Sequence, residues 1–326
     1  MAQSGEYLAG PAKAPFYICH AIIRKAISLH AIKNLIGQSI GLGLSILPNS
    51  FFKPFIRKIP LSIGKNIRIN PIVETDFMAT RFQLYTNNDI VAKSLYWGVN
   101  EGLEPETFKV LKDLLPYCKV MTDIGANIGL YAIFMAKNQP QSEIFAFEPV
   151  EVIFNRLQRN IALNGLPQVH CIHKAVSNVA GHLQLRMPKG GDIPSDASLI
   201  KDFHYKDDEC ILETIESVTL DSFVKENGIN KIDLIKIDVE TAEPLVFKGA
   251  SEILKSHRPF IISEVLKNCV ETELIPIFKE NDYLNYWISK SGLVFQDHRI
   301  DADPTYACRD FLFVPSEKVS CIGLTT

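Results

Sequence analysis

The sequence predicts an α/β fold, in which a doubly wound, mostly parallel sheet follows an N-terminal helical extension. Three observations predict this fold. From residue 105 onward, short apolar runs alternate with segments of helical periodicity. The first of these runs ends in the glycine-containing stretch "DIGANIG" at 123–129, which is typical of a strand-to-helix turn that faces a ligand. Before residue 70 the pattern is helical and basic instead.

Residues 1–70 are predicted to form a helical lead-in that is separate from the main domain at 71–326. Apolar residues at 16–36 recur at helical spacing with basic residues between them, which indicates a basic amphipathic helix. Nine Lys and Arg against one acid give the lead-in a formal charge of +8, whereas the remaining 25 basic and 36 acidic residues give −11. We expect this helix to pack on protein; the alternative is that it lies on a membrane or guides a lipid-linked substrate.

The sequence also indicates in which cellular compartment the protein is expected. No stretch predicts a transmembrane helix, and residues 1–14 lack the basic start and apolar core of a secretory signal. The seven cysteines are scattered and include no C-x-x-C pair, so neither a disulfide framework nor a zinc site is expected. We therefore expect a cytoplasmic protein, with peripheral membrane contact through 16–36 as the alternative. The sequence leaves the oligomeric state open.

Each element of the alternation is predicted from its own pattern. Pro105 suits the first position of a helix, and Gly165 suits the residue after one. The predicted helices are 105–115, 128–138, 151–164, 245–254 and 271–280. The predicted strands are 119–123, 143–147, 170–176, 232–237, 260–265 and 283–288, with an antiparallel closing strand at 310–314. Residues 187–210 form a long insertion of the kind that covers a cleft.

Ligands of such sheets bind at the carboxyl ends of the strands, where the strand order reverses. Here Gly125 and Gly129 leave room beside the backbone, with Asn127 between them. A dinucleotide asks for G-x-G-x-x-G, and Asp123 would repel its pyrophosphate. The same carboxylate would attract an ammonium group such as that of S-adenosylmethionine. The alternative is that the glycines only allow close packing and that Asp123 caps the helix.

Further acids follow later strands. Glu148, at the tip of the second strand, is placed to accept hydrogen bonds from both hydroxyls of a ribose. Asp238 and Glu240 follow a strand in "IKIDVETAE", and Glu264 ends the next one. We expect these three acids to face one cleft and to supply a general base, with Glu240 as the first choice. A divalent metal held by the three acids is an alternative that no motif requires, and it is not favoured.

These motifs, in this order and spacing, resemble the FkbM-type S-adenosylmethionine-dependent methyltransferases over residues 90–315. The stretches that carry the resemblance are "DIGANIGLYAIFMA", "IFAFEPVEVIFNRLQRNIALNG", "VTLDSF", "IDLIKIDVETAE", "LKSHRPFIISEV" and "DFLFVP". The resemblance implies a Rossmann-like class I methyltransferase fold and S-adenosylmethionine as cofactor. It implies a cofactor site at Asp123, Gly125, Asn127, Gly129 and Glu148 and a second acidic motif at Asp238 and Glu240. Thr241 stands where the family usually has Gly, so we expect altered loop angles or a narrower cleft.

The resemblance further implies O-methylation of a hydroxyl on a sugar or a polyketide, and the sequence leaves a lipid-linked glycan and a peptide open as acceptors. The alternatives are a nicotinamide-dependent oxidoreductase on a similar fold and a non-catalytic relative that only binds the cofactor. Nucleic acid is not expected as a partner, because the +8 segment lies outside the motifs and the remaining chain is acidic.

Overall fold

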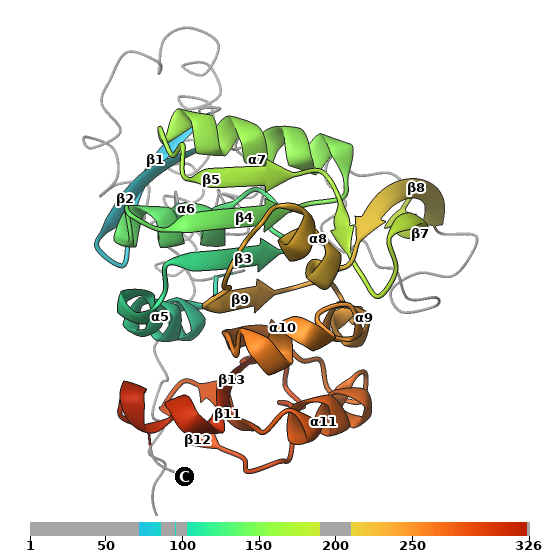
Figure 1. Cartoon of the computed structure of the whole chain (residues 1–326). Coiled ribbons are helices and arrows are strands. Elements are labelled where there is room, and N and C mark those ends of the chain that lie inside the picture. Colours follow the sequence, from blue (N-terminus) through green and yellow to red (C-terminus); the bar gives the residue numbers. More distant parts are fainter. Residues whose placement is uncertain (1–71, 86–94, 96–102, 190–209, 325–326) are drawn as a thin grey trace, which may run out of the picture. The chain divides into compact units, whose positions relative to one another are not determined.

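The structure, a computed structural model, describes residues 72–85, 95, 103–189 and 210–324 (Figure 1). All of them belong to one compact unit, residues 57–326. The predicted helix at 16–36, the boundary near residue 70 and most of the insertion at 187–210 lie outside the described residues and stay predictions. Within the described part, no helix has the length and apolar character needed to cross a membrane.

The centre of the unit is an eight-stranded sheet with the order β12-β11-β13-β10-β9-β3-β4-β5 (Figure 1). Five neighbouring strands pair in parallel, and β13 lies antiparallel between β10 and β11. The predicted mostly parallel sheet with an antiparallel closing strand is therefore confirmed. Its strands are β3 (Val120–Ile124), β4 (Glu143–Phe147), β5 (Val169–Ile172), β9 (Leu234–Ile237), β10 (Phe260–Glu264), β11 (Tyr283–Ser289), β12 (Gly292–Phe295) and β13 (Asp310–Pro315).

Helices cover both faces of the sheet, because the central strands are apolar on both sides. Successive side chains of a strand point to opposite faces. In β4, Ile144 and Ala146 belong to one hydrophobic core, whereas Phe145 and Phe147 belong to the other. The first core contains α5 (Pro105–Leu114), α6 (Leu130–Asn138) and α7 (Glu151–Leu163). The second contains α8 (Leu220–Glu226), α9 (Glu243–Lys248), α10 (Ser251–Ser256) and α11 (Glu271–Glu280).

The single strand predicted at 170–176 is wrong, since the chain forms two strands there. β5 completes the main sheet, and β6 (Ala175–Val176) pairs in a three-stranded sheet with β8 (Cys210–Val218), which pairs with β7 (Gly181–Pro188). A turn divides them, in which the N–H of Lys174 donates to the carbonyl oxygen of Ile172 at 3.0 Å. A short apolar run does not show which sheet it will join.

The single helix predicted at 245–254 is also wrong, because it is divided into α9 and α10 at Gly249. A Cβ atom at Gly249 would lie 2.0 Å from the carbonyl oxygen of Ser177, so the chain passes very close to the loop after β6. Helical periodicity continues across this break, and therefore the sequence pattern does not reveal it.

A hairpin precedes the alternation, in a stretch whose short runs, such as "RFQLYTNN", are β-prone. β1 (Ile72–Phe77) and β2 (Thr80–Tyr85) pair antiparallel, and β2 packs on α7. The side-chain oxygens of Asn160 and Asn164 on α7 accept hydrogen bonds from the backbone of Tyr85 and Gln83 at 2.7 and 2.9 Å. Two helix asparagines thus satisfy backbone groups of β2 that no further strand of the described chain pairs.

Candidate active site

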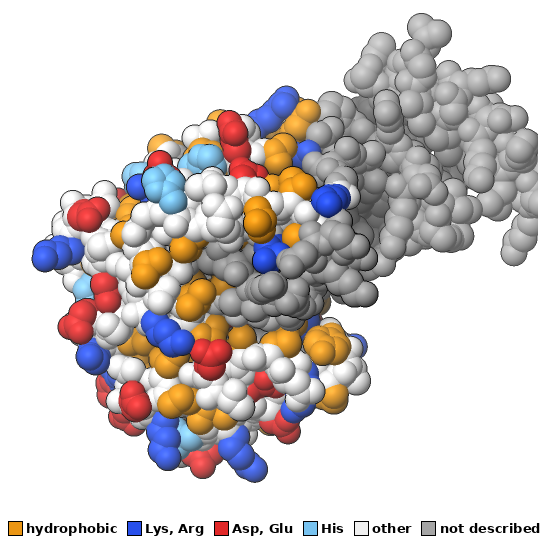
Figure 2. Space-filling model, turned by 90° about the vertical axis from the view of Figure 1, so that its right-hand side faces the viewer, with side chains coloured by type: hydrophobic (Ala, Val, Ile, Leu, Met, Phe, Trp, Pro, Cys, Tyr) orange, Lys and Arg blue, Asp and Glu red, His pale blue; other side chains and the backbone are white. Residues whose placement is uncertain are grey.

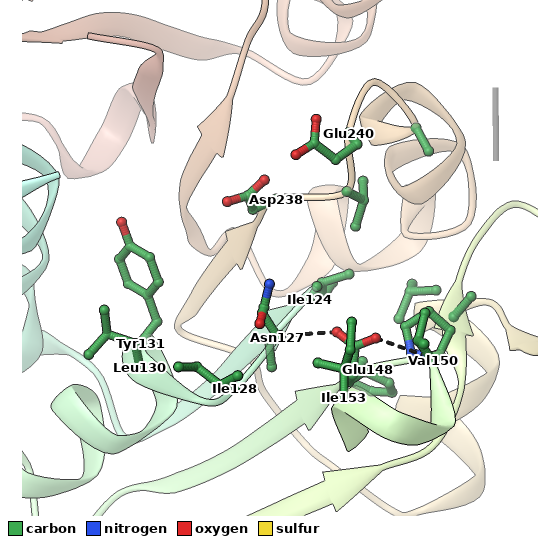
Figure 3. Close-up of a pocket in the computed structure, with 18 of the residues that line it drawn as sticks. Ile124, Asn127, Ile128, Leu130, Tyr131, Glu148, Val150, Ile153, Asp238 and Glu240 are labelled. Atoms are coloured by element: carbon green, nitrogen blue, oxygen red, sulfur yellow. Dashed lines mark hydrogen bonds between the residues drawn. The ribbon is translucent and has the colours of Figure 1, made fainter. Parts of the chain in front are cut away.

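A cavity of about 340 Å³ opens at the carboxyl ends of β3, β4 and β9 (Figure 3). This volume is within the range of small-molecule sites in proteins. The strand order reverses at β3, since β4 lies on one side of it and β9 on the other. Figure 2 views the face toward which these strands point, and apolar side chains gather in its central part. The cavity therefore lies where the sequence places a ligand.

The turn between β3 and α6 forms the floor of the cavity. Gly125, Asn127 and Gly129 all have left-handed backbone angles, with φ of 79°, 49° and 91°. A Cβ atom at Gly125 would lie 1.8 Å from the carbonyl oxygen of Asp238, and one at Gly129 would lie 2.6 Å from Leu157 Cδ1. Both glycines are therefore needed for close packing. Gly125 and Asn127 also line the cavity, whereas Gly129 is not among the lining residues.

Asp123 lies at the end of β3, and its contact with the ammonium group of the cofactor stays a prediction. The side chain is buried and does not line the cavity. Its Oδ2 accepts a hydrogen bond from the backbone N–H of Ala132, in the first turn of α6, at 2.9 Å. A carboxylate is favoured there because helix N-termini carry unpaired N–H groups and a partial positive charge. Asp123 thus fixes the turn that lines the cavity.

Glu148 lies at the end of β4 and faces the cavity (Figure 3). Its Oε1 accepts a hydrogen bond from the N–H of Val150 at 2.9 Å, and its Oε2 accepts one from Asn127 at 3.0 Å. Burial raises the pKa of Glu148 to about 7, against the effect of these two bonds. Each oxygen keeps a second lone pair. The result is a fixed pair of acceptors that fits the two adjacent hydroxyls of a ribose.

Next to Glu148, one side of the cavity is lined by apolar side chains, which form an apolar wall. Val150 and Ile153 from the start of α7 pack with residues of the small three-stranded sheet in a separate hydrophobic cluster. This surface fits a flat apolar ring such as adenine, and the run of apolar residues in "EPVEVIF" is the sequence signal that could have revealed it. The cavity-lining members of the wall are Val150, Ile153, Ala175, Val176 and Leu185.

The structure brings together the three acids that were predicted to share a cleft. Asp238, Glu240 and Glu264 each offer one carboxylate oxygen, and these oxygens lie within 4.8 Å of one another. Figure 3 shows Asp238 and Glu240 across the cavity from Asn127 and Glu148. The cavity thus has Glu148 on one side and Asp238 and Glu240 on the other, with the buried Glu264 beside them.

The loop that carries Glu240 has unusual backbone angles. Glu240 and Thr241 have φ of 52° and 72°, a region that L-residues seldom adopt. Thr241 is buried outside the cavity lining, and its Oγ1 donates to the carbonyl oxygen of Glu240 at 2.6 Å. The residue thus holds a backbone conformation that glycine adopts readily, and its side chain does not narrow the cleft as expected.

Three residues beside the acidic cluster were not predicted. Tyr131 donates its hydroxyl to Glu104 Oε2 at 2.7 Å. Arg309 Nη1 lies 2.7 Å from Glu264 Oε1, and its Nη2 lies 3.5 Å from Glu104 Oε1. Tyr131, Glu104 and Arg309 line the cavity. They come from α6 and from the segments before α5 and β13, so only the folded chain brings them together.

A buried ion pair supports this end of the site. Lys236 Nζ lies 3.2 Å from Asp310 Oδ1, and the Thr107 hydroxyl donates to Asp310 Oδ2 at 2.6 Å. Burial opposes the charge of Lys236, but Asp310 and Asp238 raise its pKa above the ordinary value. A lysine within the apolar run "LIKI" was the sequence signal for this pair. The pair joins β9 to β13 and adds a fixed positive charge near Asp238.

The strand order and the cavity together define a Rossmann-like class I methyltransferase that uses S-adenosylmethionine. The residues present fit this cofactor, because Glu148 offers paired acceptors and the adjacent wall is apolar. The chain belongs to the methyltransferase FkbM domain family, which matches residues 123–285. The predicted family and cofactor are confirmed, and the nicotinamide-dependent alternative is set aside.

The chain is similar to named methyltransferases from a fungus and an archaeon. It is 33% identical over 200 residues to methyltransferase sdnD of Sordaria araneosa, covering 53% of this chain and 74% of that protein. It is 27% identical over 202 residues to the hexuronic acid methyltransferase AglP of Haloferax volcanii, covering 61% and 75%. A crystal structure of methyltransferase FkbM from Methylobacillus flagellatus superimposes with 15% identity and a TM-score of 0.39, covering 69% of this chain and 55% of that one.

Proposed function

We propose that this enzyme transfers a methyl group from S-adenosylmethionine to a hydroxyl group of a sugar, a glycan or a related natural product. The observation that carries the proposal is the placement of Asp238 and Glu240 in the cavity, across from the ribose-binding position at Glu148. A hydroxyl is a weak nucleophile at neutral pH, and it therefore needs a nearby base. The similarity to a hexuronic acid methyltransferase supports a sugar acceptor.

The chain's own residues would hold the cofactor at one end of the cavity. Glu148 accepts hydrogen bonds from the ribose hydroxyls, and the apolar wall from Val150 to Leu185 contacts the adenine. Gly125 packs against the backbone of Asp238 and lines the cavity. S-adenosylmethionine supplies the methyl group, and the electrons of its breaking carbon–sulfur bond stay on the sulfur, which becomes a neutral thioether.

We assign Glu240 as the general base and Asp238 as the residue that orients the acceptor. Asp238 interacts electrostatically with the buried cation Lys236, and this interaction suits a group that positions the acceptor. Glu240 extends from a loop beyond the strand end, where an acceptor reaches it. The proton of the acceptor hydroxyl passes to the Glu240 carboxylate as the new oxygen–carbon bond forms.

The test is Glu240→Gln, assayed with purified enzyme and an acceptor that is found by mass spectrometry of glycans and lipids from cells with and without the gene. Loss of a general base lowers kcat by roughly 10²- to 10⁴-fold. The dissociation constant of S-adenosylhomocysteine, measured by calorimetry, should stay unchanged. Turnover at the wild-type rate would contradict the assignment of Glu240, and failure of the unmodified protein to bind the cofactor would contradict the proposed function as a whole.

A further inference from the structure

Glu264 carries a carboxylate oxygen for which the structure shows no partner. The side chain is 2% exposed, at the end of β10. Arg309 contacts its Oε1 at 2.7 Å, whereas its buried Oε2 has no hydrogen-bond partner in the described chain. Buried polar atoms nearly always have a partner, and an ion or a water molecule commonly fills that role. The orphaned oxygen therefore points to a ligand that binds beside Glu264.

The neighbouring acids have the geometry of a small cation site. The carboxylate oxygens of Asp238, Glu240 and Glu264 lie within 4.8 Å of one another. One point is therefore within about 2.8 Å of all three, close to the roughly 2.3–2.6 Å of calcium–oxygen bonds and a small movement from the roughly 2.0–2.1 Å of magnesium. All three ligand atoms are carboxylate oxygens, which hard divalent cations prefer.

The charges around the cluster also favour a cation. Arg309 neutralises part of the negative charge, but it contacts only one oxygen of Glu264. Burial and the neighbouring Asp238 raise the pKa of Glu264 well above its ordinary value. Three carboxylates this close repel one another, and either a proton or a metal ion relieves the repulsion. Protonation of Glu264 is therefore the alternative to metal binding, and an experiment must distinguish the two.

We propose that Asp238, Glu240 and Glu264 bind a divalent, oxygen-preferring cation such as Mg²⁺ or Ca²⁺ at the acceptor end of the cavity. The cation's chemical role rests on the proposed function, since it would orient the acceptor oxygens and lower the pKa of the hydroxyl. The proton then passes to the Glu240 oxygen that does not contact the cation. No sequence motif favours a metal at these acids, whereas the unpartnered oxygen of Glu264 does.

The experiment is calorimetric titration of MgCl₂ and, separately, CaCl₂ into the full-length protein after treatment with a chelator. Each titration is run with and without S-adenosylhomocysteine. We expect saturable binding of at least one ion to the unmodified protein. Asp238→Asn and Glu264→Gln should each weaken it by at least about tenfold. Glu280→Gln, an exposed acid of α11, is the matched control and should leave it unchanged.

Two further measurements, cofactor binding and the melting temperature, distinguish loss of the ion site from misfolding. Glu264→Gln should bind S-adenosylhomocysteine and melt at a temperature close to that of the unmodified protein, which excludes misfolding as the cause of lost ion binding. If the unmodified protein binds S-adenosylhomocysteine but shows no saturable ion binding up to millimolar concentrations, the metal proposal is overturned, while methyl transfer stands. If S-adenosylhomocysteine fails to bind, the proposed function is what fails.

Discussion

Asp123 lies near the end of β3 and Glu148 follows β4, and burial raises the pKa of both to about 7, yet their surroundings differ. Asp123 contacts the N-terminus of α6, whereas Glu148 lines the cavity. A strand-end acid is recognisable in a sequence, but the direction of its side chain is not. The sequence therefore predicts acids at both strand ends, whereas only the folded chain shows that Glu148 lines the cavity and that Asp123 contacts the helix. Arg309 and Glu104 could not be predicted, because they are 205 residues apart and meet only in the folded chain.

Asp123→Asn separates the role of a helix cap from the role of a direct cofactor ligand. Asparagine caps helices about as well as aspartate, so a capping role predicts a dissociation constant for S-adenosylhomocysteine within about threefold of the unmodified value. A direct ammonium contact would lose about 1.5–3 kcal/mol, which is about tenfold or more in affinity. Isothermal calorimetry distinguishes the two outcomes, and a loss of tenfold or more would restore the direct contact.

Glu148→Gln should weaken cofactor binding much more strongly than Asp123→Asn. The change replaces one of the two acceptor oxygens with an NH₂ group, which cannot accept a hydrogen bond, and an unsatisfied buried polar group costs about 1–3 kcal/mol. We therefore expect the dissociation constant to rise by about 10- to 100-fold in the same calorimetric assay. Glu143→Gln, at the opposite end of β4, is the control and should bind normally. Unchanged affinity in Glu148→Gln would remove this residue from the cofactor site.

At the scale of elements, the strands of the main sheet were predictable because they are apolar on both faces and short. By contrast, the sequence does not show that a segment predicted as one strand or one helix forms two. Residues 170–176 contribute to two sheets, and residues 245–254 form two helices, in both cases through contacts with distant segments. Neither break leaves a change of hydrophobic period in the sequence, and Gly249 alone is a weak sign of a helix end.

Gly249→Ala tests whether stability requires the close packing of Gly249, between α9 and α10, against the backbone of Ser177. The added Cβ atom would lie 2.0 Å from a backbone oxygen, so α9 or the loop after β6 must move. Overpacking of this kind costs about 1–3 kcal/mol of unfolding free energy, measured by urea denaturation. Lys255→Ala on the exposed part of α10 is the control and should change stability by less than about 0.5 kcal/mol. Equal stability of the two variants would show that the close approach is not needed.

At the scale of the whole molecule, the sheet positions every part of the site at one edge. The cavity lies at the ends of β3, β4 and β9, while the acid at the end of β10 and the ion pair with β13 complete it. This arrangement is what the alternation of strands and helices predicts, because parallel strands place their carboxyl ends together. It also buries several carboxyl groups near one another, and that has a consequence for the stability of the entire unit.

The unfolding free energy should fall as the pH rises from about 4.5 to about 7. The ordinary pKa values of Asp123 and Glu148 are 3.8 and 4.5, and burial raises both to about 7 in the folded protein. Across that window the unfolded chain has lost these two protons and the folded protein keeps them, so each group destabilises the folded state by about 1.4 kcal/mol per pH unit. Urea denaturation at a series of pH values measures the slope. Glu148→Gln and Asp123→Asn should each flatten it, since amides do not titrate, and a slope unaffected by either change would show that these carboxyl groups are already ionised in the folded protein at pH 5.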